Sequence, residues 1–274
     1  MNLDIYTEEM KKSLWDKAFF MDKIIGAKCV IDFGCADGAL ICMLKELFPS
    51  IDFYGFDNNE ELLARARENY GEDASVRKFF YSEKELNLLI SDVLARYDGS
   101  EICINFSCVL HEVFSSSPSG QRSIQRLVKA LEPKYVTVRD MFYPVSDYTN
   151  DYRWKVELDN DYVAEFEEKY GSITRTANFL HFMMKYQWKD NGWKEELKED
   201  YFSWNVRDLL NLINPDEYEV IYSVRYLLPY YADKWAALGL NPEWDTTHIQ
   251  LVIRRQSNVE SSSLRILFRC STLK

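Results

Sequence analysis

Two aspartates and two glycines fall within one short segment, in a pattern that suits a ligand carrying positive charge. The segment reads Asp32-Phe33-Gly34-Cys35-Ala36-Asp37-Gly38. It follows an apolar run and precedes the helix-forming stretch "ALICMLKELF", so we expect a strand, a glycine turn and a helix. Such a turn presents free backbone N–H groups to a ligand. A further acid, Asp57, ends the next apolar run 19 residues after Gly38.

Two ligand classes commonly bind over such a turn, dinucleotides and S-adenosylmethionine. A dinucleotide needs G-x-G-x-x-G for its pyrophosphate, but Ala36 and Ala39 occupy the second and third glycine positions. The carboxylates of Asp32 and Asp37 would also repel a pyrophosphate, at roughly 4 kcal/mol for one contact of about 4 Å at an effective dielectric near 20. The ammonium and sulfonium groups of S-adenosylmethionine are instead attracted, so a nicotinamide oxidoreductase is the less favoured interpretation.

The segment resembles motif I, D/E-x-G-x-G-x-G, of the class I S-adenosylmethionine-dependent methyltransferases, with Ala36 in the place of the middle glycine. The resemblance implies that Asp32 contacts the methionine end of S-adenosylmethionine and that Asp57 holds its ribose. It also implies that Ser82, with its neighbours Tyr81 and Glu83, lies near the adenine. The full predicted cofactor set is Asp32, Gly34, Cys35, Ala36, Asp37, Gly38, Asp57, Asn58, Ser82, Asn105, Phe106 and Ser107, the last three beside the sulfonium.

Each of these residues also has a purely structural interpretation. Gly34 and Gly38 are compatible with a tight turn of any function, although packing gives no reason for two acids there. Asp57 precedes "NNEELL" and could cap a helix. A helix N-terminus accounts for Ser82 and Glu83 almost as well as adenine does.

Strand and helix patterns alternate over the first 141 residues, which predicts a doubly wound α/β fold with a mainly parallel sheet. A helix over 7–25 is expected to lead into it. The later runs "YEVIYSVRYLL" and "HIQLVIRR" resemble the closing hairpin of the methyltransferase family and bring the sheet to seven strands. The five expected earlier strands are 28–34, 51–57, 75–81, 101–107 and 135–141.

Residues 148–204 interrupt this pattern with 14 aromatic residues among 57 and no strand alternation. They predict a helical insertion within a single domain of residues 1–255, at a place where the resembling family often builds a substrate lid. The aromatic side chains either form a small core or stack an acceptor, and Arg153, Arg175 and Lys185 could meet an anionic one. The Ser-rich tail 256–274 is disordered or adds an edge strand.

The segment "NFSCVLHEVF" follows the fourth strand and lacks the D/N-P-P-Y/F motif of enzymes that methylate exocyclic amines of bases. His111 has a pKa suited to accepting a proton at neutral pH, and Glu112 is placed to orient it. Asp140, ending the fifth strand, is the second catalytic candidate, for an acceptor amine or a proton. His181 and His248 lie in apolar patterns and are expected to be structural. Histidines so dispersed predict no metal site.

The chain carries 44 acidic and 33 basic residues, a net charge of −11. Extended binding to nucleic acid or to an anionic membrane is therefore not expected, and a small-molecule acceptor is slightly favoured over nucleic acid or protein. Six cysteines without a C-x-x-C pair predict free thiols in a reducing cytoplasm. The alternative function is a non-catalytic module that keeps the fold to bind S-adenosylmethionine or a partner.

Overall fold

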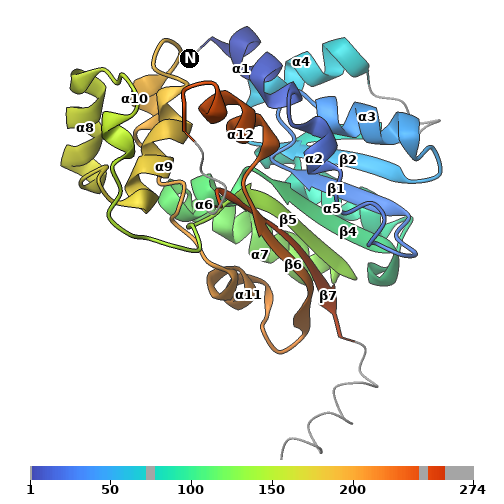
Figure 1. The fold of residues 1–274 in the computed structure, drawn as a ribbon. Helices are drawn as coiled ribbons and strands as arrows, with labels where there is room; N and C mark the ends of the chain where they lie inside the picture. The colour runs from blue at the N-terminus through green and yellow to red at the C-terminus, as the bar shows by residue number, and fades with distance from the viewer. Residues whose placement is uncertain (1, 72–77, 241–245, 257–274) are drawn as a thin grey trace, which may run out of the picture.

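A seven-stranded sheet forms the centre of the computed structural model, which describes residues 2–71, 78–240 and 246–256 (Figure 1). The strand order is β3-β2-β1-β4-β5-β7-β6. Strand β7 runs antiparallel to β5 and β6, and the other six strands all run in the opposite direction to β7. The mainly parallel sheet predicted from the sequence is thus confirmed. The strands are β1 Cys29–Phe33, β2 Asp52–Asp57, β3 Lys78–Ser82, β4 Ile102–Ser107, β5 Tyr135–Met141, β6 Tyr218–Tyr226 and β7 His248–Arg255.

The central strands β1, β4 and β5 are buried along their whole length, which explains why they read as continuous apolar runs. Register brings Asp32 of β1 beside Gly55 of β2 and Asn105 of β4. The carboxyl ends of these parallel strands therefore meet at one edge of the sheet, where ligands bind in doubly wound folds.

Helices cover both faces of the sheet (Figure 1). Apolar residues of α5, α7 and α11 pack together on one face, and those of α3 and α4 pack on the other together with Phe20 and Ile24. A short α6 follows β4 directly. These helices are α3 Ala39–Leu47, α4 Glu60–Tyr70, α5 Leu86–Leu94, α6 Leu110–Ser116, α7 Pro118–Leu131 and α11 Val206–Ile213.

The N-terminal segment differs from the single helix predicted over 7–25. It forms α1 Leu3–Lys11, capped by the side chain of Asn2, and a short α2 Leu14–Lys17. The chain leaves helical geometry at Ser13, so the two pieces take different directions. The break allows Phe20 and Ile24 to enter the sheet core while α1 packs elsewhere. The break depends on tertiary packing, which a local amphipathic pattern cannot predict.

The predicted helical insertion is present as α8 Asn160–Tyr170, α9 Thr176–Tyr186 and α10 Trp193–Glu196, gathered at the left of Figure 1. Its aromatic residues, with those of α12 Pro229–Ala236, form a second apolar core, so most of them pack rather than face a ligand. No helix in the described part of the chain has the length and apolar character needed to span a membrane. Most of the Ser-rich tail, residues 257–274, lies outside the described residues.

Candidate functional site

The glycine turn between β1 and α3 adopts left-handed backbone at Gly34, Ala36 and Gly38, with φ of 83°, 48° and 76°. A Cβ atom on Gly34 would lie 2.7 Å from the Val109 side chain, and one on Gly38 would lie 2.7 Å from Phe80. Packing as well as φ therefore requires glycine at both positions. Ala36 is the one non-glycine residue that the turn accepts in this conformation. The turn lines a cavity of about 480 Å³.

Asp32 lies at the end of β1 on the wall of this cavity and is 4 % exposed. Its Oδ1 accepts a hydrogen bond of 2.8 Å from Asn105 Nδ2, and Asn105 Oδ1 accepts one of 2.9 Å from Thr137. Burial raises the pKa of Asp32 to about 6, although the Asn105 hydrogen bond and the nearby Lys17 charge oppose this. A cationic ligand group would offset the cost of keeping this carboxylate ionised.

Asp57 ties the glycine turn to the end of β2. Its Oδ2 accepts a 2.8 Å hydrogen bond from the backbone N–H of Ala36, and its Oδ1 accepts one of 2.8 Å from Asn59. The cap of α4 is instead Asn59, which accepts from the N–H groups of Glu61 and Leu62. Asp57 is therefore not the helix cap, and burial raises the pKa of its carboxyl group.

The predicted cofactor residues divide into two groups. Those that line the cavity are Asp32, Gly34, Cys35, Ala36, Asp37, Asp57, Asn58 and Ser107. The others lie behind this wall: Gly38 supports the turn, Asn105 holds Asp32, Phe106 belongs to the sheet core, and Ser82 forms a capping box with Glu85. The Ser107 hydroxyl is buried without a hydrogen-bond partner among the described residues.

Lys17 is a cavity residue that sequence reasoning missed. Its side chain is 7 % exposed and lies near enough to Asp32 and Asp37 to feel their charge, while burial lowers its pKa. Within the described residues, no hydrogen bond or ion pair engages the side-chain ammonium of Lys17. A lysine within a charged, amphipathic stretch carries no sequence signal of burial, so only the fold reveals it.

His111, at the start of α6, also lines the cavity. Its Nδ1 lies 2.7 Å from Asp140 Oδ1, and Asp140 Oδ2 accepts from the backbone N–H groups of Leu110 and His111. Asp140 is fully buried and is not among the residues that line the cavity, unlike the direct acceptor contact predicted from its place near the end of β5. Asp140 therefore positions the His111 ring instead of contacting an acceptor. Burial lowers the pKa of His111, but the charge of Asp140 and its hydrogen bond outweigh burial, so that the pKa is raised.

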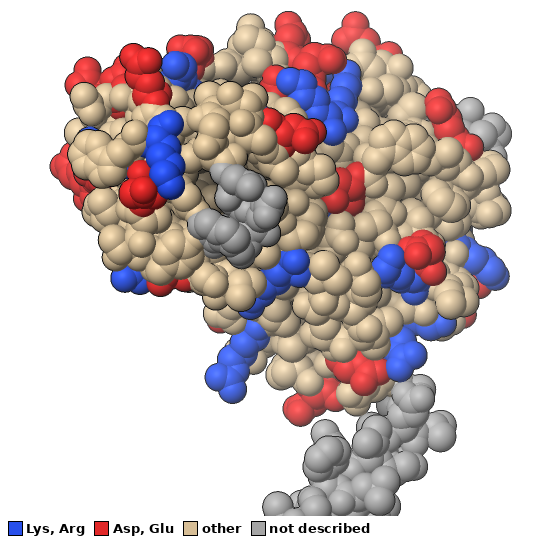
Figure 2. Space-filling view, in the orientation of Figure 1, with Lys and Arg blue, Asp and Glu red and all other residues tan. Residues whose placement is uncertain are grey.

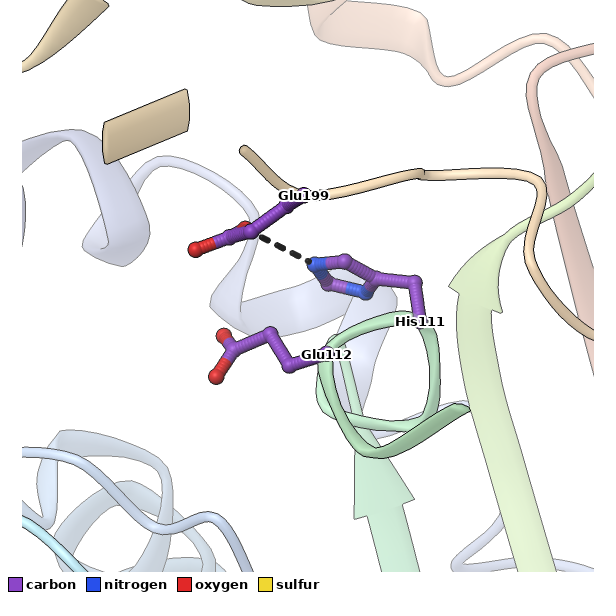
Figure 3. A group of neighbouring side chains, drawn as sticks. All are labelled: His111, Glu112 and Glu199. Atoms are coloured by element: carbon purple, nitrogen blue, oxygen red, sulfur yellow. Dashed lines mark ion pairs between the residues drawn. The ribbon is translucent and has the colours of Figure 1, made fainter. Parts of the chain in front are cut away.

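Glu112 and Glu199 approach His111 from α6 and from the insertion (Figure 3). Glu199 Oε2 lies 3.6 Å from His111 Nε2, and one ligand atom from each of the three residues lies within 4.8 Å of the others. Burial is the main cause that raises the pKa of Glu112 to about 8. The dispersed histidines had predicted no such cluster, because the two glutamates rather than other histidines complete it.

The insertion supports this cluster through its backbone. Lys185 donates hydrogen bonds of 2.6 Å to the carbonyl oxygens of Glu196 and Glu199 and lies 3.5 Å from the centre of the Tyr201 ring. Lys185 is thus fully buried as a loop support rather than facing an anionic acceptor. Arg153 and Arg175 pair with acids of the insertion and its approach segment, Glu167 and Asp147.

Helix α1 covers the cavity from outside the sheet. Tyr6 packs against Trp188 of the insertion at 5.9 Å between ring centres, and Glu9 accepts a 2.9 Å hydrogen bond from Tyr230 of α12. The cavity is consequently enclosed by parts of the chain about 220 residues apart. His181 and His248 are both buried, and burial lowers the pKa of each. His181 accepts a 3.3 Å hydrogen bond from the Tyr201 backbone N–H, whereas His248, expected to be structural, lines the cavity.

Comparison with known proteins identifies the fold. No protein-family model matches the sequence. A solved structure of an S-adenosylmethionine-dependent methyltransferase from Mesorhizobium loti is similar over 89 % of this chain and 98 % of that chain, at 14 % identity and a TM-score of 0.50. Magnesium protoporphyrin IX methyltransferase from Synechocystis PCC 6803, solved with bound SAH, aligns over 92 % of this chain and 86 % of that chain, at 12 % identity and a TM-score of 0.46. With the strand order, the first likeness shows that the chain has the class I methyltransferase fold.

Proposed function

We propose that the protein binds S-adenosylmethionine in the 480 Å³ cavity and transfers its methyl group to a second molecule bound there. The observation that carries this proposal is the continuity of the cavity. The same space is lined by the acidic glycine turn and by the group of His111, Glu112 and Glu199. A cofactor and an acceptor held in one enclosed space gain the proximity on which methyl transfer depends.

The charges around the turn suit the methionine end of S-adenosylmethionine. The carboxylate of Asp32 can accept a hydrogen bond from the ammonium group of S-adenosylmethionine. The ammonium group of Lys17 can pair with the carboxylate of S-adenosylmethionine. The remaining lone pairs of Asp57, with the neighbouring Asn58, are available to the ribose hydroxyls. The Ser107 hydroxyl, which has no hydrogen-bond partner within the described ranges, gives the cavity a further polar contact at the end of β4.

The transfer itself needs little from the protein beyond alignment and a proton acceptor. The S–CH₃ bond breaks as the methyl carbon bonds to the acceptor atom, S-adenosylhomocysteine leaves, and the acceptor loses a proton. His111, oriented by Asp140, and Glu112 are the titratable cavity groups that can take that proton in their unprotonated forms, and because the pKa of each is raised, transfer should be favoured as pH rises.

A small-molecule acceptor is the best fit. The cavity volume lies in the range of about 300–1,000 Å³ typical of small-molecule sites. Acidic and basic side chains are interspersed on the face shown in Figure 2, which gives a nucleic acid no continuous basic surface there.

The five cysteines in the described residues are free thiols, which fits a reducing cytoplasm.

Calorimetric titration tests the cofactor assignment. S-Adenosylmethionine and S-adenosylhomocysteine should bind the wild-type protein with micromolar affinity, while NAD should not. Lys17→Met should weaken the binding of S-adenosylmethionine at least tenfold, because the carboxylate of the cofactor would lose its ammonium partner. Lys12→Met is the matched control, since Lys12 also lines the cavity but is already paired with Glu9. Preferential binding of NAD would overturn the proposal.

Methyl transfer is then tested with radiolabelled S-adenosylmethionine and separate small-molecule and macromolecular fractions of a cell extract. Label in the small-molecule fraction supports the acceptor class proposed here. Label confined to protein or nucleic acid contradicts that class, and cofactor binding without transfer to any fraction favours a non-catalytic module.

A further inference from the structure

Three side chains able to bind a metal meet in the cavity, where no lysine or arginine of the described residues forms an ion pair with the carboxylate of Glu112 or Glu199. His111 Nε2 and one carboxylate oxygen each of Glu112 and Glu199 lie within 4.8 Å of one another (Figure 3). We infer that His111, Glu112 and Glu199 bind a divalent metal ion. The binding itself is independent of the proposed methyl transfer.

The orientation of His111 is that of a metal ligand. Metal-bound histidines usually donate their second ring N–H to a carboxylate or carbonyl, which fixes the ring and the tautomer. Asp140 holds Nδ1 at 2.7 Å and is itself fixed by the backbone N–H groups of Leu110 and Met141, at 2.6 and 2.7 Å. With the Nδ1 proton directed to Asp140, Nε2 faces Glu199 and offers its lone pair to a metal ion when the ring is neutral.

The distance between these facing atoms also fits. Nε2 of His111 and Oε2 of Glu199 are 3.6 Å apart, longer than a good hydrogen bond between nitrogen and oxygen. Two atoms that each lie about 2.1 Å from a metal are roughly 3.4 Å apart at a tetrahedral angle. A metal ion between them needs only a small adjustment of the side chains.

Glu112 supplies a third donor that the protein does not otherwise use. Within the described residues, no hydrogen bond or ion pair engages its carboxylate, which is directed into the same space as Glu199 (Figure 3). Lys185, the nearby buried cation, is directed to the backbone carbonyl oxygens of Glu196 and Glu199 rather than to the Glu112 or Glu199 carboxylates. An ion-binding role accounts for two carboxylates held this close together without a basic side chain between them.

One imidazole and two carboxylates form a donor set suited to Mn²⁺, Fe²⁺ or Zn²⁺. The remaining coordination positions would be open to water or to an oxygen of a molecule in the cavity. If the proposed methyl transfer is correct, the acceptor is then a compound with an oxygen able to bind the metal. The lone pair of His111 would be held by the metal, so His111 would act as a ligand and not as the proton acceptor.

Titration of the full-length protein with Mn²⁺ alone, followed by the electron paramagnetic resonance signal of free Mn²⁺, tests the inference. One ion per chain should bind to the wild-type protein without any cofactor present. Glu112→Gln and Glu199→Gln should each weaken binding at least tenfold, while Zn²⁺ should displace the bound Mn²⁺. The matched control is Glu195→Gln, a cavity-lining carboxylate outside the three-residue group.

Thermal unfolding of each variant shows whether it remains folded, so that loss of the ion is not confused with loss of structure. The inference fails if wild-type protein binds no Mn²⁺ or Zn²⁺, or if Glu195→Gln weakens binding as much as the two ligand variants do. A failure of cofactor binding with Mn²⁺ still bound would remove the proposed function alone, so the two results are distinguishable.

Discussion

Nδ1 of His111 lies 2.7 Å from Oδ1 of Asp140, and the other oxygen of that carboxylate accepts from the first backbone N–H groups of α6. One buried acid thus fixes both the imidazole ring and the helix that carries it. The pair makes the direction of Nε2 a property of the fold rather than of a flexible side chain.

Asp140→Asn should therefore impair the acceptor side of the site while leaving the cofactor side intact. We expect turnover to fall by roughly 10- to 100-fold, because the amide no longer holds the same tautomer of His111. Steady-state kinetics measure this, and titration with S-adenosylhomocysteine should give an unchanged affinity. A parallel loss of S-adenosylhomocysteine binding would show instead that Asp140 supports the whole cavity.

Asp32→Asn should increase the stability of the protein while weakening its binding of S-adenosylmethionine. The folded pKa of Asp32, about 6, exceeds its ordinary value, so the folded state binds this proton more tightly and stability rises as pH falls from about 6 to 4. Above pH 6 the ionised carboxylate costs stability, and asparagine removes that cost. The free energy of unfolding at pH 7 should rise by about 1–3 kcal/mol.

The same variant should bind S-adenosylmethionine at least tenfold more weakly, since the carboxylate for the ammonium is gone. Urea unfolding at pH 7 and pH 4 and calorimetric titration at pH 7 provide the two measurements. Asn105→Ala is a useful comparison because it removes the donor to Asp32 but retains the charge. A less stable Asp32→Asn protein at pH 7 would contradict the assigned cost of burial.

Ala36→Gly should stabilise the protein. Ala36 has φ of 48°, in the left-handed region where a Cβ atom costs about 1–2 kcal/mol, and glycine recovers part of this after its greater freedom in the unfolded chain is counted. We expect a gain of about 0.5–1 kcal/mol in urea unfolding. Cofactor affinity should not fall, because the backbone N–H that Asp57 binds is kept.

Asp57→Ala should weaken the binding of S-adenosylmethionine far more than Asn59→Ala does. The first change removes the carboxylate and releases the Ala36 N–H that shapes the turn. The second removes the cap of α4, worth about 1 kcal/mol of stability, at a cavity-lining residue whose side-chain oxygen is already engaged by two backbone N–H groups. Titration and thermal unfolding of both variants make the comparison, and equal cofactor affinity in Asp57→Ala would remove the ribose assignment.

The parts of the molecule that the sequence predicted are those determined locally. Buried parallel strands read as apolar runs, and the turn from Asp32 to Gly38 contains its own conformational requirements, so the fold and the position of this turn could both be predicted from the sequence. The assignment of residues to S-adenosylmethionine stays a prediction. Asn105 and Phe106 follow the strand pattern correctly, yet their side chains support the wall instead of forming it.

Residues brought together by tertiary packing gave no such signal. Lys17 precedes the first strand in a stretch of mixed charge, and its burial results from the break between α1 and α2. Glu199 lies 88 positions after His111, within an insertion whose composition indicated helices but not their direction. Spacing along the chain cannot specify such a pair.

The contacts of α1 with α12 also determine when the cavity can exist. Asp32, Asp57 and the glycine turn are synthesised well before Tyr230, which holds Glu9 and follows it by 221 positions. The central β5 likewise has to await β7, its antiparallel neighbour. During translation the cofactor turn is therefore complete long before its enclosure, and a nascent chain lacking the last two elements presents this polar wall to bulk water.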